Sequence, residues 1–261
     1  MSDAFFHQLD PGRFRASSWT TGPWGPGAQH AGPPTALVGR AFESLAEGAF
    51  VSRVTVEILR PVPIGDLSVE ARIARPGRSV RLAEATLSAG DDPVLLARAW
   101  LIRTTELALP DVSGPGLVPP PAGEGTPEFE GRAETDYLAA MEWRFVAGSF
   151  FERGPATAWL RMRISLVAGE DPSPLQRVLV AADSASGISA ALSFSKWLYV
   201  NPDLTVYLHR PLEGEWVCLD AATTPEPSGV GLAAATIFDE RGALGRTGQS
   251  LFLAPRQELP P

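Results

Sequence analysis

VTVEILRP, at residues 54–61, and LTVYLHRP, at residues 204–211, are two versions of one strand-like stretch. Both are rich in β-branched and aliphatic residues, and both end in Arg-Pro. The same separation joins a second pair, VRLAEATL at residues 80–87 and VGLAAATI at residues 230–237. A chance likeness between strands built from Val, Leu, Thr and Ala is the alternative explanation for either match alone. Two matches in one register indicate that a structural unit has been duplicated.

The two copies differ at one position that is informative about function. Where the first copy has Ala99, the same separation places Gln249 in the second. A polar side chain has therefore entered only one of the two units.

The composition is that of a globular protein, with 44% hydrophobic and 20% charged residues among 261, and it contains no apolar run long enough to cross a bilayer. The net charge is −8 and the arginines are scattered, which argues against a nucleic-acid partner. The N-terminus has no secretory signal pattern, so we expect a cytoplasmic protein. The lone Cys218 lies in a strand-like run, where burial is expected.

The first half of the chain reads as one helix followed by an antiparallel meander. Pro33 and Pro34 fit the first turn of a helix that runs to about Glu47, with apolar residues on one face. Turn signals then separate four strand-like runs, at residues 51–59, 66–75, 79–88 and 93–105.

The second half repeats this plan. Strands are expected at residues 140–150, 156–166, 203–210, 215–224, 230–239 and 243–253. A helix is expected at residues 174–184, because Ser173 can cap it and Pro174 fits its first turn. Asp183 falls near the C-terminal end of this helix, where the helix dipole disfavours a carboxylate.

The sequence therefore predicts an α+β protein of two fused units, related by internal duplication, each with an antiparallel sheet wrapped around a helix. The N-terminal unit spans residues 1–106 and the C-terminal unit spans residues 137–261. Residues 107–136 are rich in proline and glycine and lack apolar periodicity, which is typical of a linker.

Three stretches resemble acyl-CoA thioesterases of the type II family, which have a double hot-dog fold. HAGPPTAL, at residues 30–37, is similar to the His-Gly-Gly-Pro start of the family's first helix. NPDLTVYLHRP, at residues 201–211, resembles the second-half strand that ends in His-Arg-Pro. FDERGALGRTGQ, at residues 238–249, resembles the final hairpin that leads to a glutamine.

The resemblance implies hydrolysis of acyl-CoA thioesters to a free acid and CoA by an activated water. Carried onto matching positions, the family's water-binding residues become Asp183, Asn201 and Gln249, with Thr205 as a substitute for Asn201. Such a reaction needs a proton acceptor for water and donors for the carbonyl oxygen. The Gly32 amide, at the start of the first helix, is placed for the second task.

His30 is a further candidate for this substrate and oxyanion region, although a histidine before a helix more often caps or packs. We expect no cofactor, and no metal because three scattered histidines and one cysteine form no ligand set. Acyl-CoA is the expected small-molecule partner, with no membrane partner. Because hot-dog sheets commonly associate, a homodimer is expected.

Two alternatives remain at this point. An acyl-CoA or fatty-acyl binding protein would keep the groove without turnover. A hot-dog enoyl-CoA hydratase would need a histidine a few residues after the catalytic Asp, and the residues that follow Asp183 contain none.

Overall fold

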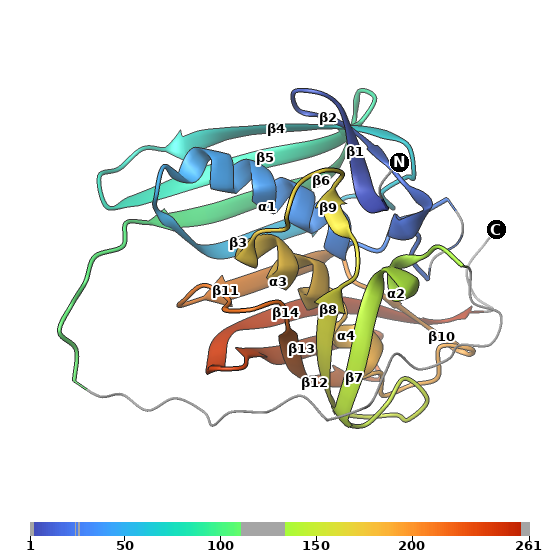
Figure 1. The fold of residues 1–261 in the computed structure, drawn as a ribbon. Helices are drawn as coiled ribbons and strands as arrows, with labels where there is room; N and C mark the ends of the chain where they lie inside the picture. The colour runs from blue at the N-terminus through green and yellow to red at the C-terminus, as the bar shows by residue number, and fades with distance from the viewer. Residues whose placement is uncertain (1–2, 24, 26, 111–133, 257–261) are drawn as a thin grey trace.

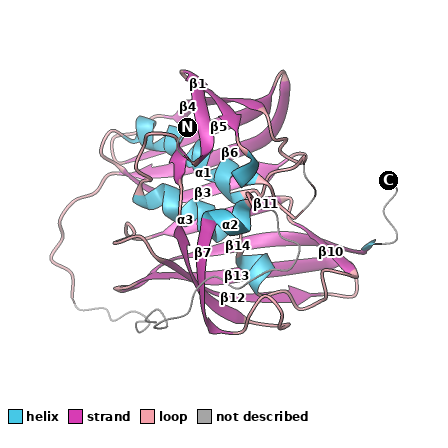
Figure 2. Ribbon diagram, turned by 45° about the vertical axis from the view of Figure 1, so that its right-hand side comes forward, coloured by secondary structure: helices cyan, strands magenta, loops and turns pink. Residues whose placement is uncertain are grey.

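The computed structural model of the chain describes residues 3–23, 25, 27–110 and 134–256. Within these ranges, fourteen strands form one sheet, in the order β7-β8-β12-β13-β14-β11-β3-β6-β5-β4-β2-β1-β9, with β10 paired to β14. The sheet curves around the helices, and α1 lies beside α3 at the centre of the molecule (Figures 1 and 2). This arrangement confirms the predicted α+β fold with helix-wrapped antiparallel sheets.

The first half contains the predicted helix and meander, preceded by a short hairpin. Its elements are β1 (Ala4–Asp10), β2 (Arg13–Ala16), a 3-10 turn (Ser18–Thr20), α1 (Gly32–Ala46), β3 (Phe50–Ile58), β4 (Asp66–Arg75), β5 (Val80–Ala89) and β6 (Asp92–Ile102).

The second half follows the same plan with additional short elements. These are α2 (Tyr137–Ala140), β7 (Met141–Ala147), β8 (Ala156–Met162), β9 (Ser165–Val167), α3 (Pro174–Ala182), α4 (Ala185–Ile188), β10 (Trp197–Val200), β11 (Asp203–Leu208), β12 (Val217–Pro225), β13 (Val230–Asp239) and β14 (Gly242–Pro255).

The core lies between the helices and the inner face of the sheet. On α1, Leu37 and Phe42 are almost completely buried. The strands alternate between buried and exposed positions, as in β14, where Gln249, Leu251 and Leu253 face inward. Burial of a full Leu or Phe side chain contributes about 1.5–3 kcal/mol, so this shared core holds both halves together.

The two halves meet where the duplicated strands pair with each other. Strands β3 and β11 are antiparallel, and Thr55 lies opposite Thr205, its counterpart in the repeat. Their hydroxyl oxygens are 3.1 Å apart, and Thr205 donates to Thr55. Equivalent residues therefore face each other across an approximate two-fold axis, as expected if a duplicated unit packs against its copy.

Several elements were not predicted from the sequence. The hairpin β1–β2 and the short strands β9 and β10 are new, and the run expected at residues 156–166 divides into β8 and β9. Strand β9 pairs in parallel with β1, a contact between distant parts of the chain that no local pattern reveals. Most of the predicted linker lies outside the described residues, and the division of the chain into units at residues 106 and 137 stays a prediction.

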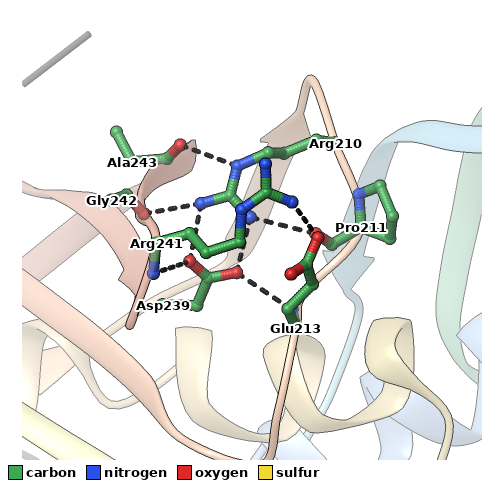
Figure 3. Close-up of polar contacts among 7 residues, drawn as sticks. All are labelled: Arg210, Pro211, Glu213, Asp239, Arg241, Gly242 and Ala243. Carbon is green, nitrogen blue, oxygen red and sulfur yellow. Dashed lines mark hydrogen bonds and ion pairs between the residues drawn. The ribbon is translucent and has the colours of Figure 1, made fainter.

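The Arg-Pro end of the second repeated stretch anchors the final hairpin (Figure 3). The Arg210 guanidinium donates to both carboxylate oxygens of Asp239, at 2.5 and 2.6 Å. It also donates to the carbonyl oxygens of Gly242, Ala243 and Pro211. Every guanidinium nitrogen is thereby engaged, so this arginine serves the fold and not a ligand.

Asp239 is completely buried and accepts two further hydrogen bonds, from the backbone N–H groups of Glu213 and Arg241. Burial alone would raise the pKa of this carboxyl group, but these bonds and Arg210 outweigh it and hold the pKa below its ordinary value. The carboxylate therefore stays charged inside the protein and depends on its arginine.

We expect Arg210→Ala to lower the free energy of unfolding by about 3 kcal/mol, because removal of one partner leaves a buried charge without its counterion. Urea denaturation at neutral pH measures this change. Arg13→Ala is the matched control, since Arg13 pairs with Asp10 on the surface and its loss should cost about 1 kcal/mol or less. Equal effects of the two substitutions would contradict the assignment.

Candidate active site

Asp183 occupies the C-cap position of α3, immediately after its last helical residue. Ser173 is the N-cap of this helix, and its side chain and that of Gln176 form a reciprocal capping box. The Asp183 side chain is only 5% exposed. A buried carboxylate at this end of a helix is unfavourable by itself and requires compensating donors.

Two amide side chains supply donors to one oxygen of this carboxylate. Asn201 Nδ2 donates to Asp183 Oδ1 at 2.8 Å, from the loop between β10 and β11. Gln249 Nε2 donates to the same oxygen at 2.8 Å, from the inner face of β14. Asn201 and Gln249 therefore both contact Asp183, although the three residues predicted to bind water come from different elements.

The second carboxylate oxygen faces the start of α1. His30 Nδ1 lies 3.2 Å from Asp183 Oδ2, and the backbone N–H groups of Ala31 and Gly32 interact with the carboxylate. Helix α1 has no side-chain cap of its own. Asp183 thus caps α1 from another helix, and the positive end of the α1 dipole offsets the unfavourable position on α3.

Burial determines the ionisation of Asp183 and His30. It raises the pKa of Asp183 to about 7, although hydrogen bonds from Asn201, Ala31, Gln249 and Gly32 favour the charged form. Burial lowers the pKa of His30 to about 3, so the imidazole is neutral. Its Nδ1 accepts the Gly32 N–H at 3.1 Å and carries no proton. A proton shared between the two residues therefore resides on Asp183.

Contacts other than the one with the Asp183 carboxylate also orient Gln249. Its Oε1 accepts the backbone N–H of Ser186 at 3.2 Å, and its Nε2 also approaches the Asp183 carbonyl oxygen at 3.3 Å. The side chain is 1% exposed, so it is not a solvent-facing strand residue. At the equivalent place in the first half, the buried Ala99 offers no such group.

The structure does not bring Thr205 into this cluster. Its hydroxyl donates to Thr55 at the two-fold axis, whereas Asn201 contacts Asp183 directly.

Sequence reasoning missed Tyr137, which stacks on His30 with ring centroids 3.6 Å apart. No motif marks this tyrosine, because its partners are distant in sequence.

Asp183 is enclosed. Two hollows lie on the outer face of the sheet, lined by residues that include Arg53, Trp100 and Tyr207, and Asp183 lines neither. With only 5% of its side chain exposed, the carboxylate is covered by its neighbours.

Two glycines allow α1 to approach α3 closely enough for these contacts. A Cβ atom on Gly32 would lie 2.3 Å from the Val180 carbonyl oxygen, and one on Gly39 would lie 2.3 Å from Leu179 Cδ1. The first contact is with rigid backbone, one turn before Asp183. The spacing between Asp183 and the start of α1 therefore depends on Gly32.

We expect Gly32→Ala to lower kcat at least tenfold and to destabilise the fold by about 1–3 kcal/mol, since the added methyl forces the helices apart. Steady-state kinetics and urea denaturation measure both effects. Gly65→Ala is the control, because a Cβ there meets nothing within 4 Å. A Gly32→Ala protein that matches this control would contradict the proposed packing.

No group of three or more potential ligands among His, Cys, Asp and Glu is placed to hold a metal ion in the described part of the chain. Within the same ranges, no helix is long and apolar enough to cross a membrane. Cys218 is buried, and burial raises the pKa of its thiol to about 12, so it is a poor nucleophile.

Family models match both halves of the chain. Residues 20–102 match the acyl-CoA thioesterase N-terminal domain, and residues 116–253 match the acyl-CoA thioesterase C-terminal domain. No curated protein sequence matches the chain.

Solved structures with a hot-dog fold superpose on nearly the whole chain. A putative thioesterase II from Thermobifida fusca is 16% identical, with a TM-score of 0.77 and coverage of 95% of each chain. A conserved protein of unknown function from Alicyclobacillus acidocaldarius is 18% identical, with a TM-score of 0.74 and the same coverage. An acyl-CoA thioesterase II from Mycobacterium marinum is 14% identical, with a TM-score of 0.67, and the match covers 98% of this chain and 97% of that one. At these identities, the likeness establishes the double hot-dog fold.

Proposed function

The chain belongs to the acyl-CoA thioesterase family, and we propose that Asp183 is the base that activates water for its reaction. The protein is an enzyme that hydrolyses acyl-CoA thioesters to a free carboxylic acid and CoA. The observation that carries the assignment of the site is the convergence of Asn201, Gln249 and His30 on one buried carboxylate.

In the proposed mechanism, the ionised Asp183 accepts a proton from a water molecule as the water oxygen attacks the thioester carbonyl carbon. Asn201 and Gln249 each donate to Asp183 and hold the carboxylate in the orientation that it needs. The tetrahedral intermediate then collapses, the carbon–sulfur bond breaks, and the proton held by Asp183 passes to the thiolate of CoA. The carboxylate is thereby restored for the next turnover.

The negative charge on the carbonyl oxygen needs a donor in the transition state. We propose that the Gly32 amide, at the positive end of α1, supplies it. This N–H donates to His30 Nδ1, so it must change its partner when the substrate binds. His30 is then free to accept a hydrogen bond from the protonated Asp183.

The direct test is release of CoA thiol from short, medium and long acyl-CoAs, measured with a thiol reagent. We expect turnover of at least part of this panel, with a preferred chain length that identifies the acyl group. Thermal protection by the same acyl-CoAs, measured in parallel, reports binding. Protection without thiol release from any acyl-CoA would mean that the protein binds its ligand without turnover.

The homodimer expected from the sequence is also a proposal, and an exposed apolar row on the outer face of the sheet supports it. Val230 lies opposite Phe252, which in turn lies opposite Val200, and Leu232 extends the row. Each side chain is 38–60% exposed. If two copies meet there, Leu232→Glu should convert a dimer into a monomer in analytical ultracentrifugation. The cytoplasmic location stays a prediction.

A further inference from the structure

Tyr137 joins the two helices that form the site, although it belongs to neither. It is 2% exposed and begins the short helix α2, which Asp136 caps by accepting the Ala139 N–H. Its backbone N–H donates to the carbonyl oxygen of Thr21, which precedes α1. The backbone of Tyr137 is therefore held in place by the capped helix α2 and by the hydrogen bond to Thr21.

The Tyr137 hydroxyl holds the last turn of α3 on both sides of Asp183. It lies 2.8 Å from the Val180 carbonyl oxygen and 2.8 Å from Ser184 Oγ. A carbonyl oxygen can only accept, so the tyrosine donates to Val180 and the serine hydroxyl donates to the tyrosine. Val180 is at the helix end, where carbonyl groups lack intrahelical partners, and this bond satisfies one of them.

The Tyr137 ring holds His30, whose imidazole lies beside the Asp183 carboxylate. It lies parallel to the His30 imidazole, with an angle of 4° between the planes and a centroid distance of 3.6 Å. This stacking fixes the rotation of the imidazole and so directs Nδ1 toward Asp183 Oδ2. One side chain thus positions both members of the contact.

We propose that Tyr137 is a positioning residue, which sets the distance and orientation between Asp183 and His30 through its hydroxyl on α3 and its ring on the imidazole. The inference rests on the proposed role of Asp183 as the base. The Tyr137 hydroxyl bonds to Val180 and Ser184, and burial together with the nearby Asp183 charge raises its own pKa further above the ordinary value of 10.0, so it does not act as an acid or base.

Tyr137→Phe separates the two parts of this role, because phenylalanine keeps the stacked ring and loses the hydroxyl. The last turn of α3 then loses an anchor beside Asp183, and a displacement of about 1 Å at a catalytic group can cost up to about 100-fold in rate. We expect kcat to fall about 10- to 100-fold while KM changes less than about twofold.

A second readout separates positioning from general destabilisation. If the contact with His30 loosens and water reaches Asp183, burial raises the pKa of this carboxyl less, so the acid limb of kcat/KM moves to lower pH. Titration of the Asp183 carboxyl carbon by ¹³C NMR reports the same change without substrate. For Tyr137→Phe, the acid limb of kcat/KM and the Asp183 titration are both expected to move to lower pH.

Tyr199→Phe is the matched control. Tyr199 is also 2% exposed, but its hydroxyl accepts a backbone N–H, from Leu192, and its ring packs against Phe194. We expect it to lower stability by a similar amount, about 1 kcal/mol, with an unchanged carboxyl titration.

A Tyr137→Phe protein with the kcat and the carboxyl titration of Tyr199→Phe would overturn the proposal. If wild type itself failed to release thiol, the proposed mechanism would fall, and the NMR titration would still decide whether Tyr137 positions the pair. The two failures are therefore distinguishable.

Discussion

Asp183→Asn is expected to lower kcat about 10³-fold, with KM for the preferred acyl-CoA nearly unchanged. Asparagine has the shape of the carboxylate and can keep hydrogen bonds to Asn201 and Gln249, but it cannot accept a proton from water at neutral pH. The rate loss therefore measures proton acceptance, for which factors of about 10²–10⁴ are typical. Thiol release under saturating substrate provides the measurement.

Asp171→Asn is the control for this substitution. Asp171 lies before the same helix and is exposed, so the same chemical change there should leave kcat within about twofold. Thermal protection by acyl-CoA should persist in Asp183→Asn, because the substitution removes no proposed substrate contact. An Asp183→Asn enzyme with kcat within tenfold of wild type would exclude this residue as the base.

The sequence predicted the repeated architecture because duplication leaves a signal that does not depend on tertiary contacts. The matching stretches at residues 54–61 and 204–211 proved to be the strands that pair at the two-fold axis. The hairpin β1–β2 escaped prediction because Ala4, Phe5 and Phe6 are all buried and show no alternation. Strand β9 has only three residues, too few for a periodic pattern.

Sequence reasoning named Asp183 and its two amide neighbours but did not give the geometry in which they meet. Asp183, Asn201 and Gln249 were singled out from motif positions, and the side chains of Asn201 and Gln249 both donate to the Asp183 carboxylate. The same reasoning treated Asp183 as poorly placed at a helix end, since it could not see that α1 presents its N-terminus there. The stacking of Tyr137 on His30 likewise depends on how the chain folds back on itself.

The pH dependence of kcat/KM should show an acid limb with an apparent pKa near 7. Burial raises the pKa of Asp183 to about 7, and only its ionised form can accept a proton from water. Activity should therefore rise about tenfold per pH unit below this value and level off above it, which gives roughly a 100-fold difference between pH 5 and the plateau. Rates over the range from about pH 5 to pH 9 test this expectation.

The same raised pKa predicts how stability depends on pH. The ordinary pKa of an Asp is 3.8, so between about pH 4 and pH 7 the folded protein binds a proton that the unfolded chain has released. Stability from this group therefore falls as pH rises through that window and is constant above it, with a total cost on the order of 4 kcal/mol.

Other carboxyl groups titrate in the same range, so the informative quantity is the difference between wild type and Asp183→Asn, in which this position cannot ionise. Urea denaturation of both proteins from pH 4 to pH 8 should show the difference growing in favour of the variant as pH rises. A constant difference, together with an acid limb near pH 4, would mean that Asp183 ionises as an ordinary surface carboxylate and that its burial does not tune the base.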